Sequence, residues 1–199
     1  LRGQSAAYLD LFRAGGAQEI PPEECLKEAS LLADRNISMA PADLRGRENR
    51  LQILTSVLTP DTRLMSTDVE AGFGIDPQWR NGSYWKAKIY FLKGDLEKAL
   101  SELRPYLSTT PEQTEGTLLE AHIRLRQKRF GDAITAAQKV IEQRQDHLEA
   151  WMIQGYGYLY MKKNSEAINT FQQARIYSKQ QQNDKVTRAI DRILTDLKR

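Results

Sequence analysis

The sequence predicts an all-α protein in which antiparallel helix hairpins stack into a solenoid, with one further helix capping its end. The first observation behind this prediction is a set of equally spaced alanines, each followed four positions later by another residue suited to a core. The pairs are Ala99 and Leu103, Ala133 and Ala137, and Ala167 and Phe171. A fixed period of about 34 residues indicates one small structural unit that is repeated and stacked. The second observation is that apolar residues between positions 80 and 199 recur at helical spacing.

Size and composition fit a soluble folded chain. With 199 residues, of which 40% are apolar and 28% charged, the chain can bury a continuous core. No uninterrupted apolar run is long enough to predict a membrane-spanning helix. Because the sequence begins at Leu1 without a Met or an apolar leader, we expect a processed or trimmed chain. Its location is cytoplasmic by default, and a periplasmic or envelope-associated location stays open.

Residues 1–79 are predicted to form an irregular helical region. A first helix is expected at about 4–13, before two glycines. Prolines followed by carboxylates start a second at 21–34, and a third runs over 41–58, where leucines and isoleucines provide the apolar face. The segment 62–79 contains two glycines and a proline, and no structure is predicted for it.

Residues 80–181 divide into three hairpins, 80–113, 114–147 and 148–181. Each consists of an apolar helical stretch, a short turn and a second helix whose apolar residues follow i, i+3, i+4, i+7 spacing. Two antiparallel helices cannot bury both of their faces alone, so neighbouring hairpins must stack. The segment after the last hairpin, 182–199, has a single apolar stripe, which is typical of a capping helix. The alternative interpretation of this stripe is a dimerisation helix.

The last hairpin carries a recognisable motif. Its residues reproduce the spacing W-x2-L-G-x2-Y and A-x3-F of the tetratricopeptide repeat (TPR), except that Gln154 stands in the leucine position. The matching residues are Trp151, Gly155, Tyr158, Ala167, Phe171 and Ala174. The chain therefore resembles the TPR family, with about three repeats over residues 80–181. This resemblance implies a right-handed superhelix with Trp151, Tyr158 and Phe171 in its core. Residues 1–79 do not match the motif in the same phase, and they are either degenerate repeats or a separate helical piece.

The resemblance also implies a partner-binding surface, because TPR proteins use the concave face made by the first helix of each hairpin. Mapping that face onto this sequence gives large apolar and aromatic residues with a few polar ones. They are Tyr84, Lys88, Phe91, Leu118, His122, Leu125, Arg126, Met152, Tyr156, Leu159 and Tyr160. An exposed surface of this kind usually marks a partner site. The alternative is that the N-terminal region folds into the groove and covers part of it.

Some TPR proteins clamp the terminal carboxylate of a peptide with basic and amide side chains. Lys88 could supply one such cation, but Leu119, Glu149 and Ile153 occupy other positions where the clamp needs polar or basic groups. We therefore expect the partner to present an apolar or amphipathic segment rather than a free carboxylate.

Residues that would support catalysis or metal binding are sparse. His122 and His147 are the only histidines, and no pair of acidic residues stands near either at metal-ligand spacing. Cys25 is the only cysteine, which excludes an internal disulfide and any zinc site with two or more cysteines. No glycine-rich phosphate loop is present. We expect no catalytic residue, no metal, no cofactor and no small-molecule substrate.

The sequence thus predicts a non-catalytic scaffold or adaptor that binds a protein or peptide in the groove of its repeats. Within this class, the chain could also be the TPR domain of a larger envelope-assembly or regulatory protein. A different class, nucleic-acid binding, is suggested by residues 81–199, where lysines and arginines outnumber acidic residues. These cations are interleaved with acids, as at Glu97 and Lys98, which favours a solvated helical surface instead. The identity of the partner and the oligomeric state are not predicted.

Overall fold

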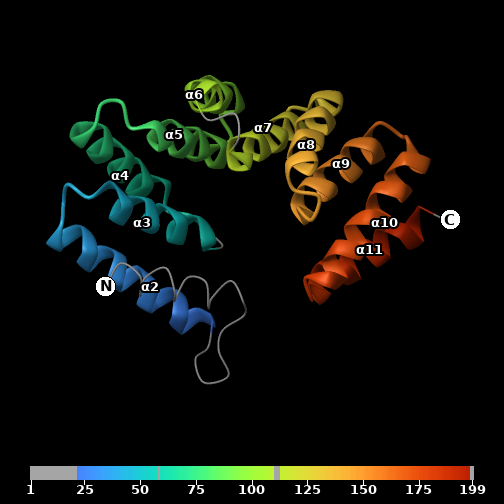
Figure 1. Ribbon diagram of the computed structural model, residues 1–199, viewed down its shortest axis with the longest axis horizontal. Coiled ribbons are helices and arrows are strands. Elements are labelled where there is room, and N and C mark those ends of the chain that lie inside the picture. Colours follow the sequence, from blue (N-terminus) through green and yellow to red (C-terminus); the bar gives the residue numbers. More distant parts are fainter. Residues whose placement is uncertain (1–21, 58, 110–112, 198–199) are drawn as a thin grey trace. The chain divides into compact units, whose positions relative to one another are not determined.

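The computed structural model describes residues 22–57, 59–109 and 113–197, and this part of the chain is all α-helical, with ten helices and no strand (Figure 1). The all-α prediction is confirmed. The helix expected at 4–13 lies outside the described residues, as does Pro111, the proline expected to close the first hairpin.

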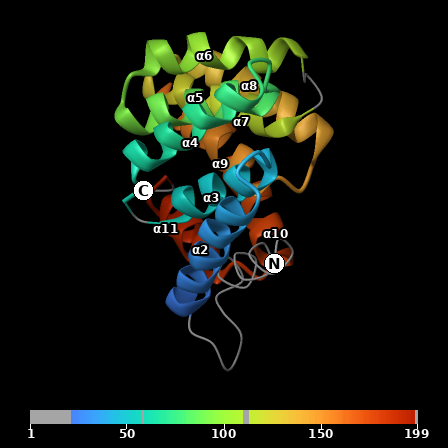
Figure 2. The same cartoon turned by 90° about the vertical axis from the view of Figure 1, so that its left-hand side faces the viewer.

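The chain divides into two compact units, residues 1–94 and 95–199, which we call the first and the second unit. The helices of the first unit are α2 (Pro22–Met39), α3 (Leu44–Ser56), α4 (Thr62–Ile75) and α5 (Arg80–Lys93). Those of the second unit are α6 (Leu96–Thr109), α7 (Thr114–Arg126), α8 (Phe130–Gln143), α9 (Leu148–Tyr160), α10 (Asn164–Gln180) and α11 (Asp184–Asp196). Within each unit, consecutive helices pack against each other in chain order, as Figure 2 shows for α2 to α5.

The regular spacing of the helices extends further toward the N-terminus than the TPR sequence motif does. The helices α4, α6, α8 and α10 begin at Thr62, Leu96, Phe130 and Asn164, so their starts are separated by one constant interval, the same as that between the alanines. In α4, Met65 and Val69 occupy the positions that Ala99 and Leu103 occupy in α6, and all four are buried. The hairpin of α3 and α4 therefore keeps the period although its residues do not match the motif. The boundary at residue 79 stays a prediction.

The turns between paired helices share one backbone conformation. Gly94, Lys128 and Lys162 follow one another at the interval of the repeat and have positive φ angles of 83°, 60° and 60°. This left-handed conformation ends a helix and reverses the chain, and glycine adopts it most readily. The sequence marks it by a glycine in the first turn only.

A polar network lies inside the first unit. Asp68 of α4 has no exposed surface, and its carboxylate accepts hydrogen bonds from Arg50 Nε at 2.6 Å and Arg47 Nη1 at 3.2 Å. Arg50 also donates to Asp34 of α2 at 2.9 Å. The hydrogen bond to Asp68 raises the pKa of Arg50 above its usual value, which outweighs the opposite effect of burial. Because a buried charge must be paired, this network fixes α2, α3 and α4 relative to one another.

Two apolar clusters lie in the core of the second unit, among the residues that the structure describes. One is built from α7, α8 and α9 around Ala121, Ala137 and Val140. The other joins α9 and α10 to α11, where Ile190 and Leu194 pack with Phe171 and Ala174. Within the chain, α11 thus buries Ile190 and Leu194 of its apolar stripe, whereas Val186, Ile193 and Leu197 are partly buried.

The aromatic residues of the motif differ in burial. Phe171 is fully buried, as expected. Trp151 and Tyr158 are only partly buried, contrary to the expectation that both lie in the core. The Trp151 ring stacks on Tyr177 with centroids 6.0 Å apart, and its Nε1 donates to the carbonyl of Gln145 at 2.7 Å. Trp151 therefore packs against both clusters from their edge and is not buried in either.

Candidate functional site

The residues mapped to the concave face lie in both units, and those on α7 and α9 form one surface of the second unit. Tyr84, Lys88 and Phe91 lie on α5 in the first unit. There Tyr84 packs edge-on against Trp85 with centroids 5.2 Å apart, and Phe91 is buried. The site described below consists of residues of the second unit alone.

A polar bridge joins α7 to α9 on this surface. His122 Nε2 and Glu149 Oε1 are 2.7 Å apart, and the two side chains are 28% and 56% exposed. His122 is one of the mapped residues of α7, and Glu149 lies in the first turn of α9, in the next repeat. The bridge therefore places a histidine and a carboxylate, both partly exposed to solvent, between α7 and α9.

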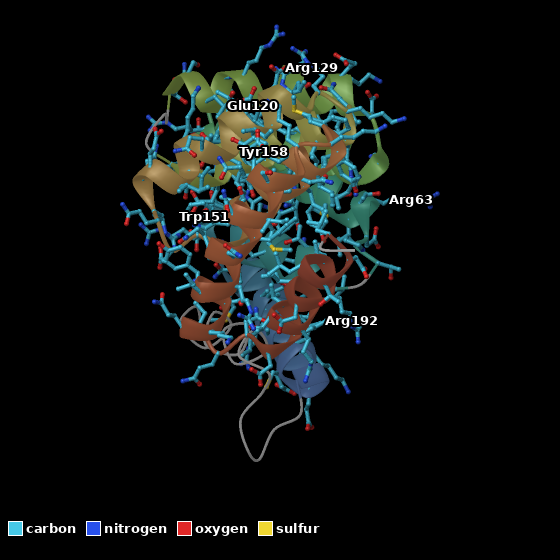
Figure 3. The ribbon with its side chains drawn as sticks, turned by 90° about the vertical axis from the view of Figure 1, so that its right-hand side faces the viewer. Arg63, Glu120, Arg129, Trp151, Tyr158 and Arg192 are labelled. Atoms are coloured by element: carbon cyan, nitrogen blue, oxygen red, sulfur yellow. The ribbon has the colours of Figure 1, made fainter. Side chains whose placement is uncertain are left out.

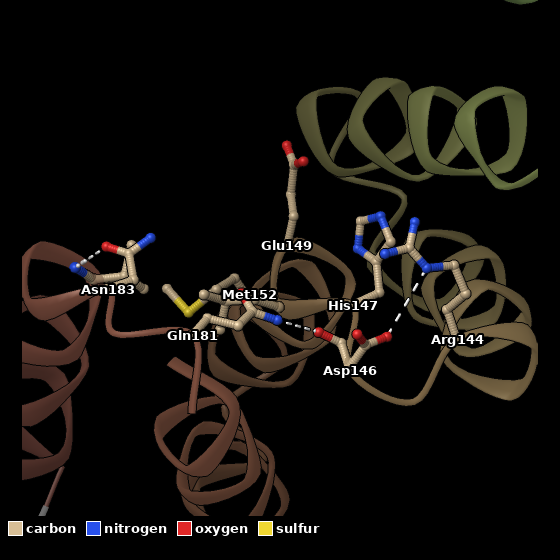
Figure 4. Close-up of a pocket in the computed structure, with 9 residues that line it drawn as sticks. Arg144, Asp146, His147, Glu149, Met152, Gln181 and Asn183 are labelled. Carbon is tan, nitrogen blue, oxygen red and sulfur yellow. Dashed lines mark hydrogen bonds and ion pairs between the residues drawn. The ribbon is translucent and has the colours of Figure 1, made fainter. Parts of the chain in front are cut away.

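A pocket of about 470 Å³ opens at one end of the surface, beside Met152 (Figure 4). It lies between the loop that joins α8 to α9 and the loop that joins α10 to α11. Its apolar lining comes from Leu148, Met152 and Val186. Its polar lining is Arg144, Asp146, His147, Glu149, Gln181 and Asn183.

Hydrogen bonds hold the two loops of the pocket in place. Gln181 Nε2 donates to the carbonyl of Asp146 at 2.7 Å, which ties one loop to the other. Asn183 Oδ1 accepts from the backbone N–H of Val186 at 3.2 Å and caps α11. The pocket is therefore preformed by contacts that do not need a ligand, as is usual for binding sites.

His147 caps α9 at the edge of the pocket. Its Nδ1 accepts from the backbone N–H of Ala150 at 3.3 Å. Burial, with a contribution from Arg144, lowers the pKa of His147 below its ordinary value. Both effects favour a neutral ring, and since Nδ1 accepts, the ring proton is on Nε2. His147 can thus donate a hydrogen bond to a ligand, a role that sequence reasoning did not assign to it.

Aromatic rings form a ladder at the other end of the surface. Phe130 and Tyr160 have centroids 5.2 Å apart, Tyr160 and Tyr156 are 6.2 Å apart, and Tyr156 and Phe171 are 5.4 Å apart. Tyr160 is 56% exposed at the outer end, and Phe171 is buried at the inner end. Burial, with the neighbouring Tyr160, raises the pKa of Tyr156. The ladder links the exposed surface to the core.

The remaining mapped residues differ in how much they face solvent. Leu118 and Leu125 are partly buried against the cluster of α7, α8 and α9, and Leu159 is partly buried against the cluster of α10 and α11. Arg126 is exposed. The surface that a partner could contact is therefore more polar than the mapping suggests, since the leucines are turned toward the protein's own core.

The sequence did not reveal the pocket because its lining combines residues of α9 and α11 with two loops that are separated along the chain by α9 and α10. Neither loop carries a motif. Met152 was mapped as a surface residue, and only the packing of α11 beside α9 turns it into part of a pocket wall.

No protein-family model matches the sequence, and no curated protein sequence matches it either. Solved structures do match. A thermophilic TPR protein of Thermus thermophilus, TTC0263, superposes with a TM-score of 0.72 and 17% identity, over 94% of this chain and 96% of that chain. The chain has the tetratricopeptide-repeat fold.

Two further TPR structures agree with this fold. The TPR2B domain of yeast Sti1, solved as a complex with pHsp70, matches with a TM-score of 0.56 and 22% identity over 60% of this chain and 95% of that chain. YrrB, a TPR protein described as having an unusual peptide-binding site, matches with a TM-score of 0.56 and 13% identity over 87% of this chain and 86% of that chain. At these identities the similarity establishes the fold, and it confirms the resemblance drawn from the motif of α9 and α10.

The described residues contain neither a candidate metal-binding cluster nor a candidate membrane-spanning helix. No three His, Cys, Asp or Glu side chains among them are close enough to hold a metal ion. None of the helices that the structure describes is both long and apolar enough to cross a membrane.

Proposed function

We propose that this chain is a non-catalytic interaction module whose second unit holds a segment of a partner protein along α7 and α9. The observation that carries the proposal is the pocket beside Met152. It has an apolar lining for a side chain and polar groups at its edge for a backbone, and its volume falls within the range of roughly 300–1,000 Å³ that is usual for ligand pockets.

The arrangement of the surface favours an extended or helical segment over a compact ligand. The bridge between His122 and Glu149 follows the pocket along α9, and Tyr156 and Tyr160 continue the same face toward the far end of the helix. A segment that followed this line would place one apolar side chain in the pocket and a second against the exposed ring of Tyr160. Such a pair of anchors is typical of peptide recognition by helical grooves.

The fold supports this proposal, because TPR structures serve as scaffolds for protein–protein interaction. Two of the matching structures point to peptide or protein binding. The Sti1 domain was solved in a complex with pHsp70, and YrrB has an unusual peptide-binding site. The pocket and the exposed face beside it support an adaptor role, for the chain alone or as a domain of a larger assembly.

The test is a selection of random dodecapeptides displayed on phage against the whole chain. Each selected peptide is synthesised, and its affinity is measured by fluorescence anisotropy. In Met152→Arg the pocket is filled by a long charged side chain, and we expect affinity to fall about ten-fold or more, the loss expected when one anchor is removed. Glu149→Arg, a change at an exposed position, should weaken the same peptides by breaking the bridge to His122.

The matched control is Ile176→Arg. Ile176 is 48% exposed on α10 and does not line the pocket, so the same apolar-to-arginine change there should leave affinity unchanged. Thermal melts of all three variants separate a loss of binding from a loss of folding. If no peptide is selected, or if selected peptides bind both pocket variants as well as the original chain, the proposal is wrong.

A further inference from the structure

Two lysines hold a backbone conformation that glycine would adopt at lower free energy. Lys128 and Lys162 both have φ of 60°, and Gly94 has φ of 83° at the equivalent turn one repeat upstream of Lys128. In the left-handed region the Cβ of an L-residue crowds the following carbonyl, and only glycine escapes this cost. The fold therefore does not need lysine at either turn. What lysine adds there is a long cationic side chain.

The two turns lie side by side in the second unit. The rings of Phe130 and Tyr160 are 5.2 Å apart, and Phe130 follows Lys128 and Arg129 directly in the sequence. Tyr160 in turn directly precedes the second turn. This contact brings five cations to one edge, which we call the basic edge: Arg126, Lys128, Arg129, Lys162 and Lys163. Arg129 extends outward there (Figure 3).

Among the described residues, the arginines and lysines of the basic edge differ in whether they have an ion-pair partner. Arg129 pairs with Asp132 at 2.5 Å. Lys128, Lys162 and Lys163 are exposed, and none of them has an ion-pair partner among the described residues. At the opposite edge, the segment 142–149, which comprises the end of α8, the loop and the start of α9, carries three acidic residues and one arginine. The basic edge thus presents three exposed lysines to a ligand.

Exposed apolar groups lie within the basic edge. Tyr160 is 56% exposed and Met161 is 41% exposed, and both stand immediately before Lys162 and Lys163. An aromatic ring and a thioether beside unpaired cations form a surface for a ligand with both carboxylates and an apolar side chain.

We infer that the basic edge receives an acidic stretch of the partner polypeptide, with its carboxylates at Lys128, Lys162 and Lys163 and an apolar side chain against Tyr160 and Met161. The inference rests on the proposed function and adds the charge of the partner segment and the end of the surface at which it lies. It differs from a carboxylate clamp, since the cations come from the turns and not from the concave side of the helices.

A polypeptide fits this edge better than a nucleic acid. Asp132 and Glu166 stand among the cations, and Glu97 of α6 accepts a hydrogen bond from Gln127 in the first of the two turns at 2.8 Å. These carboxylates would repel a phosphate backbone that has to run continuously past them. A peptide can space its acidic residues to avoid them.

The experiment uses the double variant Lys128→Gly/Lys162→Gly in the whole chain. It removes two charges and at the same time places the residue that the backbone prefers, so its melting temperature should be equal to or above that of the original chain. The control Lys139→Gln/Lys179→Gln removes the same charge from exposed positions outside the basic edge.

The probe is a tetradecapeptide of alternating Glu and Ser with one central Trp, and its counterpart has Gln in place of Glu. We expect the acidic probe to bind the original chain and the Lys139→Gln/Lys179→Gln control equally, and to bind Lys128→Gly/Lys162→Gly about ten-fold more weakly. The affinity should also decrease as salt is added, because the exposed charges are screened. The Gln probe should bind weakly to all three proteins.

Several results would overturn the inference. One is equal binding of the acidic probe to the original chain and to Lys128→Gly/Lys162→Gly. Another is tighter binding of a single-stranded oligonucleotide of the same length than of the acidic probe, with loss in the same variant, which would assign the basic edge to nucleic acid. If phage-selected peptides depend on Met152 but are not acidic and do not respond to the glycine variant, the inference fails while the proposed function stands. If only the glycine variant has an effect and Met152→Arg has none, the basic edge is supported and the pocket is removed from the proposed function.

Discussion

The ring of Phe171 occupies the space beside Gly155 where any other residue would carry its Cβ. A Cβ built on Gly155 would lie 2.7 Å from Phe171 Cε1, closer than van der Waals contact allows. The glycine of α9 and the phenylalanine of α10 are two positions of the repeat motif, and this contact is the physical reason for their pairing. It sets how closely the two helices of the last hairpin approach.

Gly155→Ala should destabilise the second unit by about 1–3 kcal/mol, because the added methyl forces the buried Phe171 ring out of place. The measurement is urea unfolding followed by tryptophan fluorescence, to which Trp151 contributes from this unit. Gly131→Ala is the matched control, since a Cβ there meets nothing within 4 Å. Within a helix, alanine is favoured over glycine by up to about 1 kcal/mol, so the control should be unchanged or slightly stabilised. Equal effects of the two changes would contradict the close contact.

Asp68→Ala should destabilise the first unit by about 3–5 kcal/mol, because it leaves Arg47 and Arg50 without their buried partner. In a Trp151→Phe background, the remaining Trp79 and Trp85 report on the first unit alone, so the loss can be assigned by fluorescence-detected unfolding. The control is Asp34→Ala, which removes the 58% exposed partner of Arg50. An exposed ion pair contributes about 1 kcal/mol or less, so the control should be much milder. A small effect of Asp68→Ala would show that the network is not needed to hold the helices.

The stability of the second unit should decrease as the pH falls from about 7 to about 5.5, and His147 should account for part of this decrease. Its pKa is lowered in the folded state, so the unfolded chain binds the proton more readily and gains from protonation below its ordinary pKa of about 6.5. Protonation of Nδ1 would also abolish the cap on Ala150. His147→Asn keeps a capping side chain without a titrating group. Unfolding free energies of the two proteins should differ in their pH dependence, with the steeper decline in the original chain; parallel pH profiles would contradict this assignment.

Substitutions of the two tyrosines in the aromatic ladder should affect different properties, one mainly the free energy of unfolding and the other mainly the affinity for peptides. Tyr156→Ala removes a ring that packs on Phe171 and should cost about 2 kcal/mol of unfolding free energy. Tyr160→Ala removes a mostly exposed ring, so we expect a loss below about 1 kcal/mol but weaker binding of selected peptides. Thermal unfolding and anisotropy on the same samples provide both measurements. A Tyr160→Ala variant that binds normally would remove this ring from the proposed surface.

Periodicity explains what could be predicted. The alanines at 99, 133 and 167 are fully buried, and the helices α6, α8 and α10 begin at the same regular interval. Helix α4 belongs to the same series but escaped prediction, because Met65 fills the position of the alanine. A larger residue can occupy that position when the neighbouring side chains leave enough space. The size of that space depends on tertiary packing and cannot be read from the sequence.

The exposure of the mapped residues was predicted less well, for a related reason. The mapping to first helices identified the face that carries His122 and Tyr160, yet it could not distinguish side chains that point to solvent from those that pack inward. Leu118 and Leu125 pack inward because the adjacent helix α8 offers them an apolar surface. The pocket was missed because its two loops, which the hydrogen bond from Gln181 to Asp146 joins, lie far apart along the chain.

The sequence by itself determined the hairpins, their period and the face on which a partner is expected, since these depend on helical spacing and on small residues at close approaches. Only the tertiary structure decided that Asp68 is paired in the interior, that Met152 lines a pocket and that two lysine-bearing turns share an edge. Each of those features joins residues from different helices or turns, and their proximity is a product of packing, which no local pattern encodes.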